Sequence, residues 1–238
     1  MSAAVPHRVI VCADDYGMTP GVSRAIRELL AARRISATSV MAASAFWPEQ
    51  APALKAMAAG WDIGLHVTLT DQVPLGPMPS FAPSGRFPGL GAVYKAGIGR
   101  RLPLGEIRQE IDRQIASFID HFGGPPAHID GHHHIHQLPG IRDLVIDAAS
   151  RLGHGAGKVW VRSCSESPHL IWRRGVAIGK ALAIGALGNG VKQRARRAGV
   201  PFNRGFSGVY DFLGERRPTG DLFRRFLMNA GDNTLIAA

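Results

Sequence analysis

The sequence predicts an α/β fold with a parallel sheet. Short apolar runs, typical of strands buried on both faces, alternate with longer segments whose apolar residues recur at helical spacing. The functional groups of such folds gather at the carboxyl ends of the strands. In chain order, the elements we expect are strands at 9–13, 35–43, 61–67, 127–132 and 158–163 and from Thr234, and helices from Pro20 and at 48–59, 106–122, 141–152 and 221–228.

The first strand and the first helix show how these assignments are made. Residues 9–13 are all apolar, and the acids that follow indicate a buried strand rather than a signal peptide. Thr19 then supplies a capping side chain and Pro20 a first-turn proline, after which Val22 and Ile26 keep helical spacing. A strand followed at once by a helix is the repeating unit of the predicted fold.

The later elements follow the same rules. Residues 35–43 and 61–67 read as short strands after a turn and after a helix, respectively. The segment 106–122 is amphipathic, with isoleucine and phenylalanine on one face and charges elsewhere. The helix at 141–152 separates the histidine-rich strand from the strand at 158–163. The alternation therefore continues through most of the chain.

Three segments depart from this alternation. Residues 71–105 are rich in proline and glycine, which predicts a long loop that is a lid, a binding loop or a mobile segment. Residues 170–199 are basic and apolar, which fits an ordinary helical insertion, an interfacial helix in contact with anionic lipid, or an apolar wall for a hydrophobic substrate. Residues 206–211 resemble a turn with an aromatic wall. We expect residues 1–238 to form one catalytic domain that includes these segments.

The composition narrows the classes of function. The 238 residues carry a formal net charge of +10 and 45% hydrophobic residues, which allows a sizeable core and suggests an anionic partner. We find no nucleic-acid-binding motif and expect no nucleic-acid partner. No apolar run approaches about 20 residues, the length of a membrane span. Cys12 and Cys164 make no disulfide framework, which fits a reducing compartment.

The segment 126–136 contains five histidines and an aspartate. Imidazole is the commonest protein ligand for metals, and a neighbouring carboxylate suits a divalent ion. If the segment begins as a strand, His128, Asp130 and His132 share one face. If a tight turn follows, His134 and His136 approach the same cavity. We therefore predict a metal site here rather than an exposed histidine-rich loop.

Other candidate ligands also lie at predicted strand ends. Asp14 and Asp15 follow the strand at 9–13, and His66 lies near the end of the strand at 61–67. The two acids point to opposite faces if the strand geometry continues, so that one can bind a metal and the other act as a base. One carboxylate and two imidazoles leave positions on a divalent ion for water and substrate. This pattern predicts metal-assisted hydrolysis.

Three motifs together resemble a known family. Residues 13–17 read Ala-Asp-Asp-Tyr-Gly, residues 64–66 read Gly-Leu-His, and residues 128–136 read His-Ile-Asp-Gly-His-His-His-Ile-His. In order and spacing over residues 7–165, they resemble the YdjC-like carbohydrate deacetylases, which include the chito-oligosaccharide deacetylases. The resemblance implies an irregular TIM-like (β/α) barrel of the polysaccharide-deacetylase kind. It also implies removal of an acetyl group from an N-acetylated sugar with Mg²⁺ or Zn²⁺.

The resemblance also implies roles for single residues. The metal ligands would be Asp15, His66 and His132, and Asp14 would be the general base. The family usually carries a His-Pro-Gly element after its last strand, and this sequence stops where that element would begin. We therefore expect a truncation, or a catalytic acid from elsewhere, for which His136 is the candidate. The remaining residues expected to bind substrate or support the ligands are His128, Asp130, Tyr16 and His134.

Further likeness is to the hopanoid-biosynthesis-associated branch of the family. It rests on the segments 172–197 and 201–208, and it implies an N-acetylglucosaminyl hopanoid, a sugar on a polycyclic lipid, as substrate. We accordingly expect a cytoplasmic protein with peripheral contact to the inner membrane through residues 170–199. The oligomeric state stays open, a homodimer included. The alternatives are a non-catalytic metal- or lipid-binding protein, or a hydrolase of another sugar bond or of a phosphoester.

Overall fold

The structure is a computed structural model that describes residues 7–153, 158–211, 219–228 and 230–238. The described strands form a seven-stranded sheet in the order β5-β4-β3-β2-β1-β7-β6, and every neighbouring pair is parallel. The parallel α/β fold predicted from the sequence is therefore confirmed. The strands are β1 (Val9–Tyr16), β2 (Ala37–Val40), β3 (Asp62–Val67), β4 (His128–Gly131), β5 (Trp160–Val161), β6 (Gly205–Ser207) and β7 (Thr234–Ala237).

The sheet curls until its two edges approach each other. β5 and β6 are the edge strands, yet Val161 of β5 forms a parallel bridge with Phe202, shortly before β6. The backbone N–H of Val161 donates to the carbonyl of Pro201 at 2.9 Å. The irregular TIM-like (β/α) barrel implied by the family resemblance is confirmed, as a curled seven-stranded sheet among the described residues.

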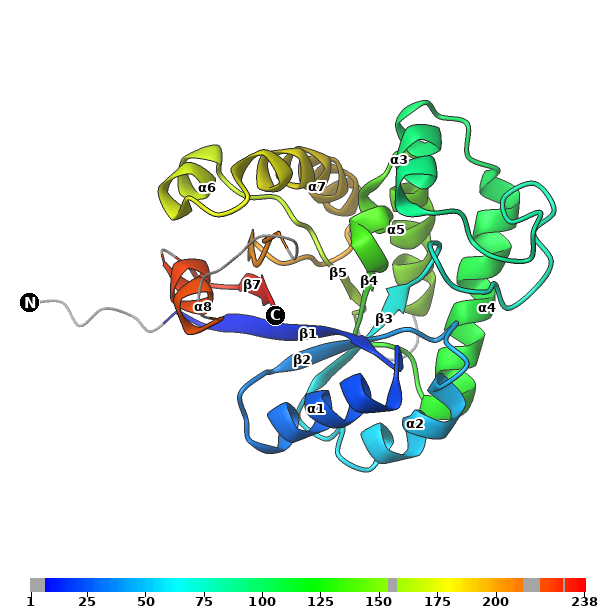
Figure 1. The fold of residues 1–238 in the computed structure, drawn as a ribbon, viewed down its shortest axis with the longest axis horizontal. Coiled ribbons are helices and arrows are strands. Elements are labelled where there is room, and N and C mark those ends of the chain that lie inside the picture. Colours follow the sequence, from blue (N-terminus) through cyan, green and yellow to red (C-terminus); the bar gives the residue numbers. More distant parts are fainter. Residues whose placement is uncertain (1–6, 154–157, 212–218, 229) are drawn as a thin grey trace, which may run out of the picture.

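Helices cover both sides of this sheet. In Figure 1, α1 and α2 lie on one side of β1 and β2, whereas α6 and α7 lie on the other. Buried apolar side chains of the strands, such as Leu65 and Ile129, pack in one cluster with residues of α1, α4 and α5. The helical elements are α1 (Pro20–Ala31), α2 (Trp47–Lys55), α3 (Leu90–Ile98), α4 (Leu104–Phe122), α5 (Ile141–Leu152), α6 (Pro168–Arg174), α7 (Ile178–Ala198), α8 (Thr219–Leu227) and the 3₁₀ turn η1 (His132–Gln137).

The helix α4 shows how sequence pattern becomes packing. Ile107, Ile111 and Phe118 of its apolar stripe are buried, as the spacing predicts. The helix ends at Gly123, whose φ of 92° is favourable only for glycine. α5 begins and ends at the residues predicted from the sequence. Helix periodicity therefore predicted α4 and α5 closely.

The proline- and glycine-rich segment is more regular than the sequence suggests. Residues 71–105, predicted to be one long loop, contain the helix α3. Val93 and Gly97 of α3 are buried, and a Cβ atom on Gly97 would lie 3.0 Å from the side chain of Leu138. The glycine that weakens the helical pattern is thus the residue that lets α3 approach η1. The prediction of a turn at residues 206–211 is wrong in part, because Phe206 and Ser207 belong to β6 and pair with β7.

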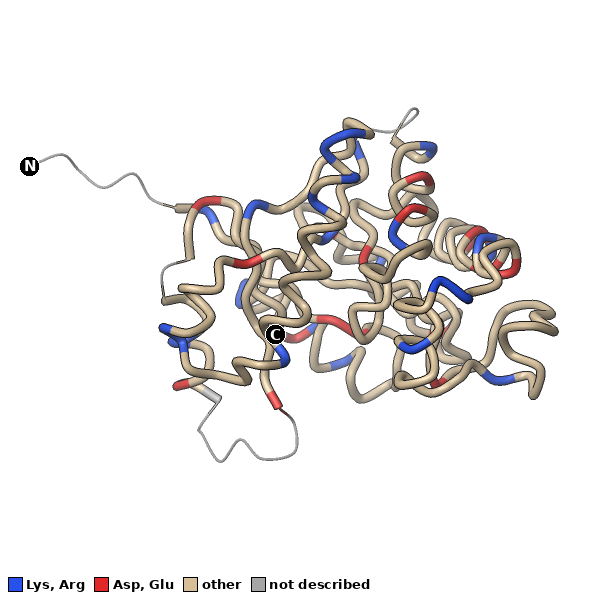
Figure 2. Tube along the Cα trace, turned by 90° about the horizontal axis from the view of Figure 1, so that it is seen from above, with Lys and Arg blue, Asp and Glu red and all other residues tan. Residues whose placement is uncertain are grey.

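The basic and apolar segment 170–199 is helical, as predicted. It forms α6 and α7, which are separated at Gly175 and Ala177, both with positive φ. None of the described helices combines the length and the apolar character needed to span a bilayer. Figure 2 shows Lys and Arg on many separate elements, with Asp and Glu interspersed among them. The net charge of +10 is therefore carried by scattered residues as well as by this segment.

Candidate metal centre

β1 ends in an irregularity that brings both of its acids to one cavity. The register of β1 against β2 shifts between Ala13 and Tyr16, and Asp15 has a φ of 67°. This left-handed conformation costs a typical residue roughly 1–2 kcal/mol, and Asp tolerates it better than most. The alternation of a regular strand is lost here. Asp14 and Asp15 therefore both line the cavity, although an unbroken strand would separate them.

Asp15, His66 and His132 converge from β1, β3 and η1. Oδ1 of Asp15 lies 3.2 Å from Nε2 of His66 and 2.9 Å from Nδ1 of His132. One donor atom from each side chain lies within 4.8 Å of the other two. Both histidines are buried, whereas the Asp15 side chain is 31% exposed and opens the group to the cavity. One carboxylate and two imidazoles at this spacing fit a divalent ion that keeps positions for water and substrate.

The orientation of His66 is fixed by a second carboxylate. Nδ1 of His66 donates to Oδ1 of Asp130 at 2.6 Å, which leaves Nε2 facing Asp15. Burial alone would lower the pKa of His66, but the neighbouring carboxylates, Asp130 foremost, raise it to about 10. Burial would likewise raise the pKa of Asp15, but hydrogen bonds from His132 and His66 lower it below its usual range. A carboxylate behind an imidazole that faces a ligand position is typical of metal sites.

Arg162 is the functional residue that the sequence interpretation missed. Its side chain is fully buried just after β5, and its Nη1 and Nη2 donate to Oδ2 and Oδ1 of Asp14 at 2.7 and 2.6 Å. Nη2 also pairs with Asp130 at 2.5 Å. One guanidinium therefore joins the candidate base to the carboxylate that orients His66. The available signal was a charged residue inside a predicted buried strand, which requires a charged partner.

Asp14 is kept ionised by these contacts. Burial would raise the pKa of Asp14, but the charge and hydrogen bonds of Arg162 outweigh it and lower the pKa. The hydroxyl of Ser39, on β2, donates to Oδ1 of Asp14 at 3.0 Å and lies 2.9 Å from Oδ2 of Asp130. Each carboxylate oxygen offers about two acceptor positions. Arg162 and Ser39 together occupy both positions on Oδ1, whereas Arg162 alone occupies one position on Oδ2. Oδ2 of Asp14 therefore retains an acceptor position in a residue that lines the cavity.

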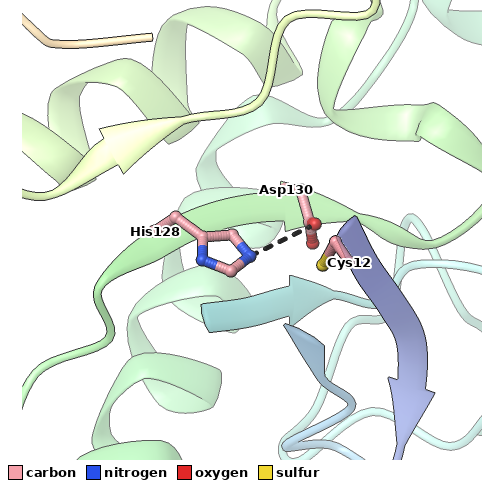
Figure 3. Close-up of side chains that lie close together, drawn as sticks. All are labelled: Cys12, His128 and Asp130. Atoms are coloured by element: carbon pink, nitrogen blue, oxygen red, sulfur yellow. Dashed lines mark ion pairs between the residues drawn. The ribbon is translucent and has the colours of Figure 1, made fainter. Parts of the chain in front are cut away.

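A second group of possible donors, Cys12, His128 and Asp130, does not fit a cation. Figure 3 shows Nε2 of His128 facing Asp130, 3.6 Å from Oδ2, with the sulfur of Cys12 nearby. However, Nη2 of Arg162 lies 3.2 Å from Sγ of Cys12 and pairs with Asp130. Burial raises the pKa of Cys12 well above its usual range, which keeps the thiol neutral. The guanidinium already supplies the positive charge of this group, so we assign it no second ion.

His128 is a packing residue rather than a lining residue. Its ring is fully buried and stacks on Trp160, with 4.2 Å between ring centroids. A Cβ atom on Gly64 would lie 2.2 Å from Nε2 of His128. Only glycine fits at that position of β3 while the ring keeps its place. The glycine of the Gly64–His66 motif is therefore explained by the ring of His128 on the neighbouring strand.

The other histidines divide between the cavity and the core. His133 and His134 have φ of 55° and 59°, and both line the cavity. His136 is fully buried, its Nε2 donates to the carbonyl of Arg162 at 3.1 Å, and it does not line the cavity. The hydroxyl of Tyr16 donates to the carbonyl of Gln50, so Tyr16 also points away from the cavity. The structure thus brings Asp14, Asp15, His66, His132 and His134 together in one cavity and leaves Tyr16, His128 and His136 outside it.

The cavity at this site has a volume of about 410 Å³. That size lies within the range of small-molecule sites. Part of its wall comes from the three segments that depart from the strand–helix alternation. Leu90 and Tyr94 belong to α3, whereas Ile184 belongs to α7, and Val209 and Tyr210 follow β6. The cavity therefore combines acids and histidines with a lining from α3, α7 and the segment after β6 that is largely apolar or aromatic apart from Lys180.

These features define a class of protein: a (β/α) barrel with a candidate metal centre at the carboxyl ends of its strands, open to a small-molecule cavity. Within that class, this chain belongs to the YdjC-like protein family, whose profile matches residues 8–237. The family resemblance drawn from the three sequence motifs is thereby confirmed.

Two relatives are chitooligosaccharide deacetylases. The protein of Enterobacter sp. (strain 638) is 38% identical over 146 residues, which cover 61% of this chain and 56% of the relative. The protein of Serratia marcescens is 39% identical over 137 residues, which cover 58% of this chain and 53% of the relative. The chain thus spans about half the length of the curated relatives that it matches.

The fold is shared with a solved structure. A crystal structure from Enterococcus faecalis V583, provisionally described as a cellobiose-phosphate cleavage protein, matches with a TM-score of 0.65 and 22% identity. The match covers 97% of this chain and 79% of that one. At this identity the likeness shows the fold alone.

Proposed function

We propose that this protein is a metal-dependent carbohydrate deacetylase that removes the N-acetyl group of an N-acetylglucosamine-type sugar. The observation that carries the proposal is the convergence of Asp15, His66 and His132 beside Asp14 in one cavity. Two relatives named chitooligosaccharide deacetylase support the class of reaction.

In this proposal Asp15, His66 and His132 hold a divalent ion, Mg²⁺ or Zn²⁺. When bound, such an ion polarises the amide carbonyl and lowers the pKa of a water molecule. Asp130 keeps Nε2 of His66 directed to the ion position by accepting the proton of Nδ1. Since Asp130 is itself held by Arg162, the orientation of the ligand depends on a fully buried ion pair.

Asp14 acts as the general base. Arg162 keeps it ionised and fixes its orientation, and Oδ2 retains one acceptor position for the proton of the attacking water. The water oxygen bonds to the acetyl carbon, and its proton passes to Asp14. The C–N bond then breaks, the amine nitrogen takes the proton from Asp14, and acetate leaves. One carboxylate can therefore perform both proton transfers.

The catalytic role predicted for His136 stays a prediction. Burial, foremost, lowers the pKa of His136 to about 4, and its ring contacts the carbonyl of Arg162 rather than the cavity. We assign proton donation to Asp14 because its carboxylate belongs to a residue that lines the cavity. His136 then supports the site by positioning the backbone of Arg162.

More specifically, we propose that the substrate is an N-acetylglucosaminyl sugar linked to a lipid, such as a hopanoid. Apolar side chains of Leu90, Ile184 and Val209 line the same cavity as the acids, and an apolar aglycone would lie against them. Trp172 on α6 is 63% exposed and is followed by the exposed Arg173, which supports peripheral contact of residues 170–199 with the inner membrane from the cytoplasm.

Acetate release is the direct test of this function. Purified protein is incubated with N-acetylglucosamine conjugates, lipid-linked and free, and acetate, phosphate and sugar products are measured before and after chelation. Acetate that disappears with chelation supports the deacetylase. Phosphate or a shortened sugar chain would identify a different hydrolase. A bound ion without any product would identify a non-catalytic binding protein.

A further inference from the structure

A second cavity, which we call the α6–α8 cavity, lies between α6, α7, β6 and α8. Its volume is about 440 Å³, and it shares no lining residue with the cavity of the metal centre. Phe206 lies in its wall and also contacts the ring of His134, with 5.7 Å between ring centroids. The two cavities are therefore neighbours with separate linings. The proposed deacetylase mechanism uses none of the side chains that line the α6–α8 cavity.

Basic side chains outnumber acidic ones in the wall of the α6–α8 cavity. Arg174, Lys192 and Arg204 line the cavity, together with one described acid, Glu166. Arg174 is 3% exposed and forms an ion pair with Glu166, in which Nη1 donates to Oε2 at 3.0 Å. The charged ends of Lys192 and Arg204 have no hydrogen-bonding or ion-pair partner among the described residues. The wall therefore carries two positive charges that no described acid compensates.

Several hydrogen-bond donors in the wall also lack acceptors. Nε of Arg174 and Oγ of Ser207 are buried without a hydrogen-bond partner among the described residues, and Ser207 is 2% exposed. A buried polar group left without a partner is unfavourable, and a ligand that pairs with it removes this cost. Asn189 accepts from Ser165 through Oδ1 at 2.6 Å, which leaves its amide NH₂ as a donor. Each of these groups can donate a hydrogen bond, so the complementary ligand is a group rich in acceptor oxygens.

The remaining wall is apolar. Leu170, Phe226 and Met228 line it beside the charged residues, and the side chain of Met228 is 42% exposed at the end of α8. We propose that the α6–α8 cavity binds a phosphate group. A phosphate monoester carries a charge of about −1.5 to −2 at pH 7, which matches the two uncompensated cations. The group comes either from a small free molecule or from the headgroup of an anionic lipid whose apolar part lies against α6 and α8.

Two binding measurements on the full chain test this proposal, both with chelator present so that the metal centre does not contribute. Calorimetry measures the affinity for inorganic phosphate, and sedimentation measures binding to phosphatidylcholine vesicles with and without phosphatidic acid. The double substitution Lys192→Ala/Arg204→Ala should lower the affinity about tenfold or more, since two charge-assisted hydrogen bonds are lost. Ser207→Ala should lower it as well, although it changes no charge.

The matched control is the double substitution Arg196→Ala/Arg197→Ala. It removes the same charge from exposed residues in the last turn of α7 that do not line the cavity. Phosphate affinity should stay nearly unchanged in this variant. Dependence on Lys192 and Arg204 with inorganic phosphate would identify a free ligand, and the same dependence only with phosphatidic acid would identify a lipid. An equal loss in both double variants, or no binding to either probe, would overturn the proposal.

Discussion

Asp14 and Asp15 are adjacent in sequence and have different partners. Asp15 contacts the imidazoles of His66 and His132, whereas Asp14 is held by both terminal nitrogens of Arg162. The positive φ of Asp15 separates the two side chains without sending them to opposite faces of the sheet. The same residue type is therefore suited to two tasks, because its partners differ.

Substitution of Asp14 should affect turnover rather than ion binding. Asp14→Asn removes the proton acceptor and keeps the shape, so kcat for acetate release should fall by roughly 10²–10⁴. The affinity for the divalent ion should change little, because the donor atoms of Asp15, His66 and His132 remain. Acetate assays and calorimetry with the ion measure the two quantities.

Asp15→Asn is the matched variant, since it makes the same chemical change one residue further along. It should weaken ion binding first, and activity should recover in part at high ion concentration. Undiminished acetate release by Asp14→Asn would show that Asp14 is not the general base. If both variants lost ion binding equally, the division of tasks between the two acids would be wrong.

Arg162 should matter for stability as well as for activity. Arg162→Ala leaves the buried carboxylates of Asp14 and Asp130 without their cation, and such a loss typically costs about 3–5 kcal/mol. Arg108→Ala is the control, because it breaks an exposed ion pair with Asp147 worth at most about 1 kcal/mol. Urea unfolding measures both. Similar free energies of unfolding for the two variants would contradict the role assigned to Arg162.

The sequence revealed the candidate ligands because their chemistry is unusual at strand ends. Asp14, Asp15 and His66 each follow or end an apolar run, and His132 lies in a dense histidine segment. Arg162 could not be found in that way, because its partner Asp14 lies 148 positions earlier in the chain. A buried arginine in a strand predicts that some acid is nearby, but only the fold identifies which one.

At the scale of elements, the close approach of β3 and β4 depends on Gly64. The Gly64→Ala substitution places a methyl group inside the ring of His128, whose other face is stacked on Trp160. Overpacking of this kind costs typically about 1–3 kcal/mol, so the free energy of unfolding should fall by that amount or more. Because His66 lies two residues further along β3, activity should fall as well.

Gly105→Ala is the control for this substitution. Gly105 lies in α4, and a Cβ atom there would meet open space. Alanine is favoured over glycine in a helix by roughly 0.5–1 kcal/mol, so this variant should be slightly more stable than the wild type. Urea unfolding of the two variants gives opposite signs if the packing argument is right. A stable Gly64→Ala protein would show that the ring of His128 can move aside.

Helices with a buried stripe could be predicted closely, and short irregular elements could not. α4 and α5 follow their apolar periodicity. α3 contains four glycines or alanines that make its pattern faint, and its packing against η1 is a tertiary effect. β6 has three residues, too few for any alternation to be recognised. α3 lines the cavity of the metal centre and β6 lines the α6–α8 cavity, so the sequence was least informative at the walls of the two cavities.

At the scale of the whole molecule, ion binding and stability should be linked through pH. Without a bound cation, His66 has a pKa of about 10 against 6.5 for the free side chain. A histidine with a raised pKa in the folded state stabilises the fold below pH of about 6.5, and this contribution is lost as pH rises towards 10. Cation binding must displace the proton of His66 and is therefore favoured as pH rises. The difference in Tm between ion-loaded and chelated protein should increase over this interval.

Thermal unfolding at about pH 6.5, 7.5 and 8.5, with saturating ion or with chelator, measures this difference. Asp130→Asn is the control variant, because it removes the largest of the interactions that raise the pKa of His66. The increase with pH should be weaker in that variant. A difference in Tm that stays constant across the three conditions would contradict a proton-bearing His66.

The overall architecture was predictable, whereas its closure was not. Alternating strands and helices indicated a parallel sheet, and the three motifs indicated its family. No pattern in the sequence shows that Val161 meets Phe202, because a single bridge between chain segments about 40 residues apart leaves no periodic signal. The prediction of one domain over residues 1–238 stays a prediction.

That bridge has a consequence for the chemistry. Val161 precedes Arg162 directly, and the segment that it meets leads through β6 to Val209 and Tyr210 in the cavity wall. The bridge that closes the barrel is thus one residue away from Arg162, whose guanidinium holds Asp14. Opening this junction would release the Asp14 carboxylate from Arg162 and widen the cavity together, so a partly open barrel would lose the proposed activity before its core unfolds.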